Sequence, residues 1–351
     1  MPDVTATRPN PVDDAIGYVR PLVRALHHHV DALAASLTGV ADRTRRTRIA
    51  GAWVYLSGVV AWAEDHNLID PWLRSGLEGM PGRFTDRPGY AVRLAQAMAA
   101  LTVHPATQWL LHPRYSSLQQ ATPSDTACQA LVEWWAADAP NLAHDAETGP
   151  PSITGWIVGD LLQHVTDERR KGNALAQTPW WVADGILDLT LLPAAAEFAD
   201  EPLIRTIDPC AGTGHFLIRT IDYLWEWYTT GSLHPRQMHT DPVSGGTPVA
   251  PAEAIRRIIA GVDGVELDPL TAAVARLRCT VYIGHLMHQA GLLGGPLRLD
   301  RIPAWVRPRI AVGDSLLLGR IGRDEYTRLH PALADLPGAA FPLDDFTWQV
   351  D

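Results

Sequence analysis

A glycine-rich segment in the second half of the chain has the composition of a nucleotide-binding turn. The segment Asp208–Gly214 (DPCAGTG) follows the short apolar run Leu203–Ile207 and precedes a stretch with helical periodicity, His215–Tyr228. A glycine-rich turn between a strand and a helix lets the backbone come close to a ligand, and the start of the helix offers unpaired N–H groups. Taken alone, such a turn is as often only a tight connection between two elements.

Two further carboxylates, each in or just after an apolar run, strengthen the interpretation of the glycine-rich segment as part of a nucleotide-binding site. Glu266 lies in the run Gly264–Leu267 and could accept hydrogen bonds from both hydroxyls of a ribose. Asp314, followed by Ser315, could accept a hydrogen from the exocyclic amine of adenine. The glycine turn and Glu266 are much further apart than the roughly 20 residues of a dinucleotide-binding fingerprint. The spacing therefore disfavours a plain NAD-binding unit.

The second half of the chain alternates predicted strands and helices that would bring these residues together. Strands are expected at Leu203–Ile207, Gly264–Leu267 and Arg309–Val312, and helices at His215–Tyr228, Ala252–Ala260 and Leu270 to about His288. This order predicts a parallel sheet with right-handed crossovers, and ligands of such sheets bind at the carboxyl ends of the strands. The Pro- and Gly-rich stretch Gly231–Pro251 is expected to be a loop.

The first half of the chain predicts helices only. Apolar residues recur at helical spacing from Asp14 to about Asp70, and again over Tyr90–Leu101 and Thr126–Ala137. A polar stretch with several Pro and Gly residues, Ala139–Pro151, is the expected linker. We therefore expect a helical N-terminal domain over residues 1–150 and a second domain over residues 151–351.

Composition excludes several classes of protein. With 351 residues, 46% hydrophobic, the chain can bury a core, and its net charge of -10 opposes sequence-independent attraction to a polyanion by the chain as a whole. Cys128, Cys210 and Cys279 lie too far apart for a disulfide framework or zinc site, and the latter two are expected to be buried. The few, isolated cysteines indicate a reducing cytoplasm. No apolar stretch is long enough for a membrane helix, and the N-terminus is not signal-like, so a soluble protein is expected.

Two further clusters have ordinary structural explanations. The imidazoles of His27–His29 would point in different directions on a helix, so a partly exposed helical face is a better interpretation than a metal site. The basic residues between Arg43 and Arg48 could touch the phosphates of a nucleic acid, but such runs more often form a solvated helix face.

Four segments resemble the motifs of S-adenosylmethionine-dependent DNA adenine-N6 methyltransferases in which the cofactor motifs precede the catalytic motif. Asp208–Leu217, Gly264–Pro269 and Val312–Leu316 resemble the first three motifs, with the small residue and the cysteine of the first in exchanged order. Gln177–Ala183 resembles the motif whose Thr-Pro segment closes over the methionine end of the cofactor. The region from Gly159 to Leu192 and the helical N-terminus most resemble the PglX-like methyltransferases of the phage growth limitation and BREX-2 defence systems.

The resemblance covers nearly the whole chain but only the first part of such an enzyme. It implies an α/β fold, a helical N-terminal domain followed by an incomplete Rossmann-like class I methyltransferase sheet, and S-adenosyl-L-methionine as cofactor. It assigns cofactor binding to Thr178, Pro179, Asp208, Pro209, Cys210, Ala211, Gly212, Thr213, Gly214, His215, Phe216, Glu266, Leu267, Asp314 and Ser315. His215 is expected to shape the cofactor pocket rather than to act as a base.

The acceptor motif of the family, Asn-Pro-Pro-Tyr or a close variant, does not occur in the sequence. The Pro-Pro pair at Pro150-Pro151 precedes the cofactor motifs and is not a candidate. We therefore expect no catalytic residue in this chain, a sheet without the catalytic-motif strands, and a first strand with one unpaired edge. A second polypeptide that supplies those strands and the target-recognition domain is favoured over a fold-back of Ala332–Asp351 onto that edge.

Three functional hypotheses follow. The favoured one is the cofactor-binding part of a split DNA adenine-N6 methyltransferase in a phage-defence or restriction-modification system, inactive alone and contacting DNA only through the assembled complex. The second is a non-catalytic module that senses S-adenosylmethionine or scaffolds a defence complex. The third, a methyltransferase acting on a small molecule or protein, would need an acceptor site in the helical N-terminal domain.

Overall fold

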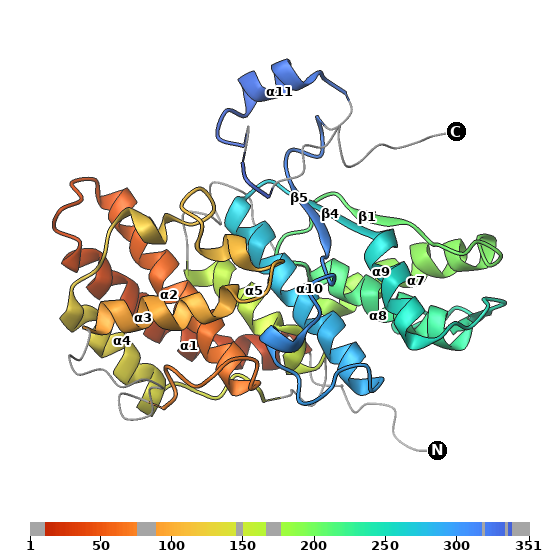
Figure 1. Ribbon diagram of the computed structural model, residues 1–351, viewed down its shortest axis with the longest axis horizontal. Helices are drawn as coiled ribbons and strands as arrows, with labels where there is room; N and C mark the ends of the chain where they lie inside the picture. The colour runs from red at the N-terminus through yellow and green to blue at the C-terminus, as the bar shows by residue number, and fades with distance from the viewer. Residues whose placement is uncertain are drawn as a thin grey trace.

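A long buried helix, α10 (Pro269–Gln289), runs through the middle of the structure and contacts both the N-terminal helices and the sheet (Figure 1). The computed structural model describes residues 11–75, 89–144, 150–165, 177–317, 320–333 and 336–338, with side chains of residues 11–20 and 323 not described. Buried residues, including Arg276 and Arg278, occupy nearly the whole length of α10, so neighbouring elements pack around all sides of this helix. Asp268 caps its N-terminus, where its carboxylate accepts from the Thr271 N–H at 2.9 Å.

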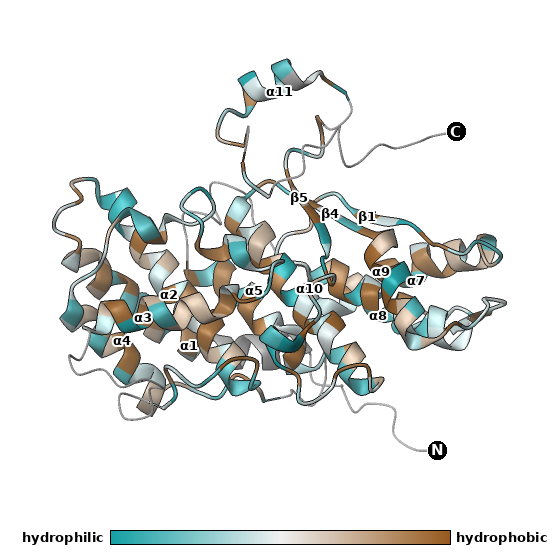
Figure 2. Cartoon of the chain, viewed as in Figure 1, coloured by the Kyte–Doolittle hydropathy of each residue, from teal (hydrophilic) through white to brown (hydrophobic). Residues whose placement is uncertain are grey.

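The N-terminal half is helical, as the periodicity predicts. Its helices are α1 (Pro11–Ser36), α2 (Arg43–Asp65), α3 (Tyr90–Ala99) and α4 (Asp125–Ala137), joined by the short 3-10 helices η1 (Ala100–Thr102), η2 (Gln108–Leu111) and η3 (Ser117–Gln120). Asp42 and Ser124 cap α2 and α4 through hydrogen bonds to backbone N–H groups of the first turn. Figure 2 shows hydrophilic and hydrophobic segments alternating along these helices, as in amphipathic helices that cover a core.

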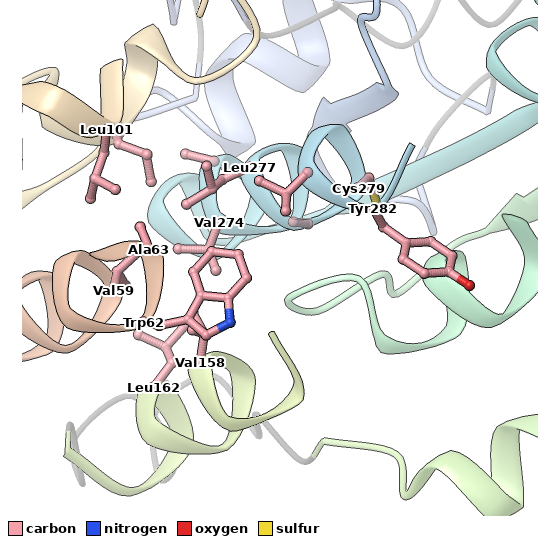
Figure 3. Close-up of a cluster of buried hydrophobic side chains, with 14 of the residues drawn as sticks. Val59, Trp62, Ala63, Leu101, Val158, Leu162, Val274, Leu277, Cys279 and Tyr282 are labelled. Atoms are coloured by element: carbon pink, nitrogen blue, oxygen red, sulfur yellow. The ribbon is translucent and has the colours of Figure 1, made fainter. Parts of the chain in front are cut away.

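A single hydrophobic core joins these helices to the rest of the chain. Helix η4 (Ser152–Thr154) and helix α5 (Trp156–Val165) follow the expected linker, and α5 packs against α1 and α2. Figure 3 shows Trp62 of α2 among side chains of α5 and α10, and its indole N–H donates to the Ser152 carbonyl at 3.1 Å. Residues 145–149 of the linker lie outside the described residues.

The sheet has three parallel strands in the order β1-β4-β5. These are β1 (Thr206–Asp208), β4 (Val262–Glu266) and β5 (Arg309–Val312), and they alternate with α8 (His215–Thr230), α9 (Pro251–Gly261) and α10. The predicted parallel pairing is thus confirmed. Within the described ranges β1 pairs only with β4, so its other edge has no strand beside it.

The first strand is shorter than predicted. It begins at Thr206, which pairs with Val262, the first residue of β4, so residues 203–205 have no strand opposite them. The N–H of Ile204 instead donates to the Tyr228 hydroxyl at 2.8 Å. A side chain of α8 therefore replaces the strand partner at this position.

The expected loop Gly231–Pro251 contains a small hairpin, β2 (Ser232–Leu233) with β3 (Val243–Ser244), and is fixed to helix α7 (Trp180–Glu197). The Asp188 carboxylate of α7 accepts three backbone N–H groups of residues 236–238 at 2.7 to 3.0 Å, and the Tyr223 hydroxyl at 2.7 Å. Burial opposes the charge of Asp188, but the hydrogen bonds from Met238 and its neighbours outweigh burial and hold the pKa of Asp188 below its usual 3.8.

None of the helices in the described part of the chain is long and apolar enough to span a membrane.

Asp188→Asn tests how this loop is held. The substitution removes a charge that accepts several hydrogen bonds, so the free energy of unfolding at neutral pH should fall by about 2 kcal/mol. Because the folded-state pKa of Asp188 is lowered, its stabilisation is present above pH 3.8 and is lost as the pH falls through the folded-state value. Urea unfolding should therefore show that the difference in the free energy of unfolding between wild type and variant becomes smaller as the pH is lowered.

The matched control is Asp241→Asn, at an exposed carboxylate of the same loop. Its unfolding should match that of the wild type within about 0.5 kcal/mol. Amide hydrogen exchange at residues 236–238 should accelerate only in the Asp188 variant. Unchanged exchange there would show that Asp188 does not hold the loop.

Candidate functional site

The carboxyl ends of the three strands bring the predicted acidic residues together. In the strand register Asp208 lies opposite Gly264, and Glu266 lies opposite Val312. Asp208 therefore ends β1, Glu266 ends β4, and Asp314 follows β5 by two residues, all at one edge of the sheet. The prediction that strand order would gather these side chains at one edge is confirmed.

The glycine turn lies directly on the end of β4. Gly212 and Gly214 have φ values of 54° and 87°, in the left-handed region that favours glycine. The N–H of Gly212 donates to Glu266 Oε2 at 2.9 Å, and the N–H of Ala211 donates to the Val265 carbonyl at 2.9 Å. The turn and the second strand are thus one hydrogen-bonded unit, from which α8 begins.

Glu266 keeps acceptor capacity beyond its role in the turn. Its Oε1 accepts the N–H of Asp268 at 2.8 Å, so each carboxylate oxygen has one backbone donor and a further lone pair. Burial raises the pKa of Glu266, as do the carboxylates of Asp268 and Asp208. Burial also raises the pKa of Asp208, whose Oδ1 accepts the Cys210 N–H at 3.0 Å. Additional hydroxyl donors would relieve this unfavourable burial of charge.

The Thr-Pro segment contacts the glycine turn from the side of α5 and α7. Thr213 Oγ1 lies 3.2 Å from Gln177 Oε1, and His215 Nδ1 lies 3.3 Å from the Thr178 carbonyl oxygen. Pro179 is exposed and precedes α7. The amide nitrogen of Gln177 is buried without a hydrogen-bond partner among the described residues. A hydrogen-bond acceptor on a ligand held between Gln177 and the turn would satisfy it.

His215 is a buried neutral ring at the base of the turn. Its ring stacks on Trp156 of α5 at 3.8 Å between centroids, and only 2% of the residue is exposed. Burial, reinforced by the charge of Arg278, holds the pKa of His215 well below its usual value. The ring therefore carries no charge at neutral pH and packs between α5 and the turn.

A fully buried arginine, Arg278, lies beneath the turn and was not among the residues predicted from the sequence. Its Nη1 donates to the carbonyl and hydroxyl oxygens of Thr213 at 2.7 and 2.9 Å, and its Nε donates to the Thr154 carbonyl at 3.0 Å. Burial lowers its pKa to about 10, so the guanidinium stays charged at neutral pH. Two arginines, Arg276 and Arg278, within the mostly apolar run Val274–Tyr282 were the available signal.

At the third strand Asp314 is held on several sides. Its Oδ1 accepts the Leu316 N–H at 2.9 Å, its own N–H donates to the Tyr326 hydroxyl at 2.8 Å, and its Oδ2 lies 3.1 Å from His330 Nε2. Ser315 is half-buried. Leu267 and Leu316 are 47% and 73% exposed, so they leave apolar surface beside Glu266 and Asp314 respectively. Such surface suits the face of a purine ring.

One of the two cysteine expectations was wrong. Cys210, in the glycine turn, is exposed, whereas Cys279 is buried in α10 as expected. The face formed by His27–His29 is partly exposed, as expected: His28 is exposed, His27 is half-buried, and His29 is buried against Trp134 at 5.2 Å between ring centroids. The described residues contain no group of His, Cys, Asp and Glu side chains that could hold a metal ion.

A separate groove of about 380 Å³ lies in the helical half, between α3, residues 68–72 and residues 298–300. It shares no lining residue with the strand ends. Its walls include Trp72, Gln96 and an Arg298 guanidinium already paired with Asp70 at 2.9 Å. The groove is therefore a feature apart from the candidate site.

Comparisons with known proteins identify one curated relative. No family model matches the chain. The adenine-specific methyltransferase PglX of Streptomyces coelicolor is 31% identical over 294 residues, which cover 78% of this chain and 22% of the relative. The chain thus spans about a fifth of the length of that relative. Among solved structures, a DrdV–DNA complex matches at 13% identity over 91% of this chain and 27% of its own, with a TM-score of 0.42.

Gly159→Ala tests the packing of α5 against the turn. A Cβ at position 159 would overlap His215 Nε2 and Thr213 Oγ1. The overlap should outweigh the better helix propensity of alanine and lower the free energy of unfolding by about 2 kcal/mol. Denaturant unfolding measures the loss. Gly39→Ala, where nothing lies within 4 Å of the added carbon, should change stability by no more than about 0.5 kcal/mol. Equal changes in the free energy of unfolding for the two substitutions would show that α5 does not pack tightly against the turn at position 159.

Proposed function

The chain is PglX-like, and we propose that it is the S-adenosyl-L-methionine-binding part of a DNA adenine-N6 methyltransferase. We assign it to a phage-defence system of the phage growth limitation or BREX-2 type, or to a restriction-modification system, acting in the cytoplasm. The observation that carries the proposal is the hydrogen-bonded unit of the glycine turn and Glu266 at the strand ends, in a chain 31% identical to PglX over 294 residues.

The sheet fits the expected part of a Rossmann-like methyltransferase fold. Three parallel strands in the order β1-β4-β5 alternate with helices, and the predicted binding residues follow each strand. We propose that residues 151–351 form the methyltransferase domain, without its catalytic-motif strands, and that residues 1–150 form a helical N-terminal domain. The continuous core around α10 would hold the two domains rigidly together.

The residues at the strand ends fit the cofactor part by part. Glu266 would accept hydrogen bonds from the ribose hydroxyls, and Asp314, with Ser315 beside it, would accept one from the adenine amine. Leu267 would contact the purine face. The amide nitrogen of Gln177, which has no partner among the described residues, and the adjoining Thr178-Pro179 fit the amino-acid end of the cofactor, whose carboxylate is an acceptor.

The glycine turn would bring backbone N–H groups close to the ligand, and Asp208 would lie beneath it. The turn residues proposed to contact the cofactor are Pro209, Cys210, Ala211, Gly212, Thr213, Gly214, His215 and Phe216. When bound, the cofactor supplies an electrophilic methyl group on its sulfonium. The chain's own residues would bind and orient it, and positioning would provide most of the catalysis.

We propose that a second polypeptide supplies the acceptor motif and the target-recognition domain. No Asn-Pro-Pro-Tyr segment occurs in the sequence, and β1 has no strand at its second edge among the described residues. An unpaired edge is a template for a further strand. DNA would then be contacted through the assembled complex.

A second candidate function follows from the same missing motif. Without an acceptor motif, the chain could bind S-adenosylmethionine as a sensor or scaffold and transfer no methyl group. The two candidates differ in one outcome: a sensor binds the cofactor but transfers nothing with any partner.

Cofactor binding is tested first, by calorimetry with S-adenosylmethionine and Glu266→Gln. The glutamine amide would place N–H donors against the Gly212 or Asp268 N–H, so affinity should fall at least about tenfold. The matched control is Asp263→Asn, on the same strand, whose carboxylate pairs with Arg309 at 2.6 Å. It should bind like the wild type. Failure of the wild-type chain to bind would overturn the proposal.

Methyl transfer is tested with radiolabelled cofactor and adenine-containing duplex DNA. The chain alone should transfer no label, because it carries no acceptor motif. A complex with a polypeptide that carries Asn-Pro-Pro-Tyr should transfer label to adenine N6, and Glu266→Gln in that complex should lose most of the activity. Transfer by the chain alone would contradict the split enzyme, and cofactor binding without transfer in any complex would favour the sensor.

A further inference from the structure

We propose that His330 and Tyr326 are positioning residues that fix the Asp314 carboxylate for recognition of the exocyclic amine of adenine. This inference rests on the proposed cofactor site. Both residues belong to the segment after β5, in or next to helix α11 (Arg323–Leu329), which Figure 1 shows above the three strands. The motif resemblance ends at Leu316 and includes neither residue.

The geometry holds Asp314 at three points. The Tyr326 hydroxyl accepts the Asp314 backbone N–H at 2.8 Å, and His330 Nε2 lies 3.1 Å from Asp314 Oδ2. The Leu316 N–H donates to Oδ1 at 2.9 Å, in a local turn. Since a carboxylate only accepts, Nε2 of His330 must carry the proton in this contact. Backbone and both side-chain oxygens of Asp314 are therefore restrained together.

One face of α11 carries both contacts. Tyr326 and His330 are four residues apart, and their rings lie 5.1 Å apart between centroids. The His330 N–H donates to the Tyr326 carbonyl at 2.8 Å, which links the two residues through the backbone as well. Tyr326 is 3% exposed, and burial raises the pKa of its phenol, so the hydroxyl stays neutral. The buried Tyr326 therefore holds His330 in the position from which its ring contacts the Asp314 carboxylate.

The restraint leaves Asp314 free to accept one more hydrogen bond. Each carboxylate oxygen has two acceptor directions, and each uses one of them here. The side chains of Asp314 and His330 are 21% and 24% exposed, so a ligand can reach them. An aspartate in an exposed turn otherwise samples several rotamers, and fixing it beforehand removes an entropic cost of binding. His330 thus favours ligands that carry a donor where adenine carries its amine.

The experiment compares two ligands that differ by one amine. Calorimetry would measure S-adenosylhomocysteine and its analogue with hydrogen in place of the purine 6-amino group. The wild-type chain should bind S-adenosylhomocysteine about tenfold more tightly than the analogue without the amine. His330→Leu should weaken binding of S-adenosylhomocysteine about fivefold and leave the analogue unchanged, so that the preference nearly disappears. His330→Gln, whose amide N–H can reach the same oxygen, should restore most of the preference.

Controls separate positioning from folding. His234→Leu removes an exposed histidine that pairs with Glu226 at 2.6 Å, away from the site, and should change neither affinity. Tyr326→Phe should reduce the preference in the same way as His330→Leu. Equal weakening of both ligands by His330→Leu, or no change, would overturn the inference. Tighter binding of S-adenosylhomocysteine would also overturn it, because His330 would then compete for Asp314. If the wild type binds neither ligand, the proposed function itself fails.

Discussion

The charged guanidinium of Arg278, buried in the middle of α10, is the constraint around which the candidate site is built. Burying an unpaired charge costs several kcal/mol, so the surrounding backbone must supply acceptors. The Thr154 carbonyl supplies one from η4, and Thr213 supplies two from the glycine turn. The guanidinium thereby fixes the turn relative to the helical half of the chain. Removing either acceptor group would leave a buried charge with too few partners.

The close packing of α5 follows from the same constraint. With the turn fixed over Arg278, α5 approaches so closely that only glycine fits at position 159, and Trp156 stacks on His215. The neutral state of His215 also depends on the buried positive charge beside it. On the other side of the turn, the Glu266 carboxylate accepts a hydrogen bond from the Gly212 N–H. These contacts within the chain hold the strand ends in place, which lowers the entropic cost of binding a ligand there.

Local sequence signals predicted the elements that local interactions determine. β5 has the bounds predicted from its apolar run, and α10 begins at Pro269, one residue before the predicted start at Leu270, because the Asp268 cap and the first-turn proline act within a few residues. The positions of the candidate residues Glu266 and Asp314 were predictable, because Glu266 ends β4 and Asp314 follows β5 by two residues. β1 was predicted too long because its partner, β4, begins only opposite Thr206. The partners of Arg278 and of Asp188 could not be predicted, since they lie far away in sequence.

In the proposed split enzyme, cofactor binding and methyl transfer would be divided between polypeptides along the order of the strands. In the proposed site, Glu266 and Asp314 lie on β4 and β5, so the groups for ribose and adenine come from strands already paired within this chain. The missing acceptor motif would join at β1, on the opposite side of the sheet from β5. β1 is only three residues long, and a short edge strand is a poor template for nonspecific pairing. In this proposal the cofactor would bind before a partner arrives, and a partner strand that paired with β1 would extend the described sheet beside the glycine turn.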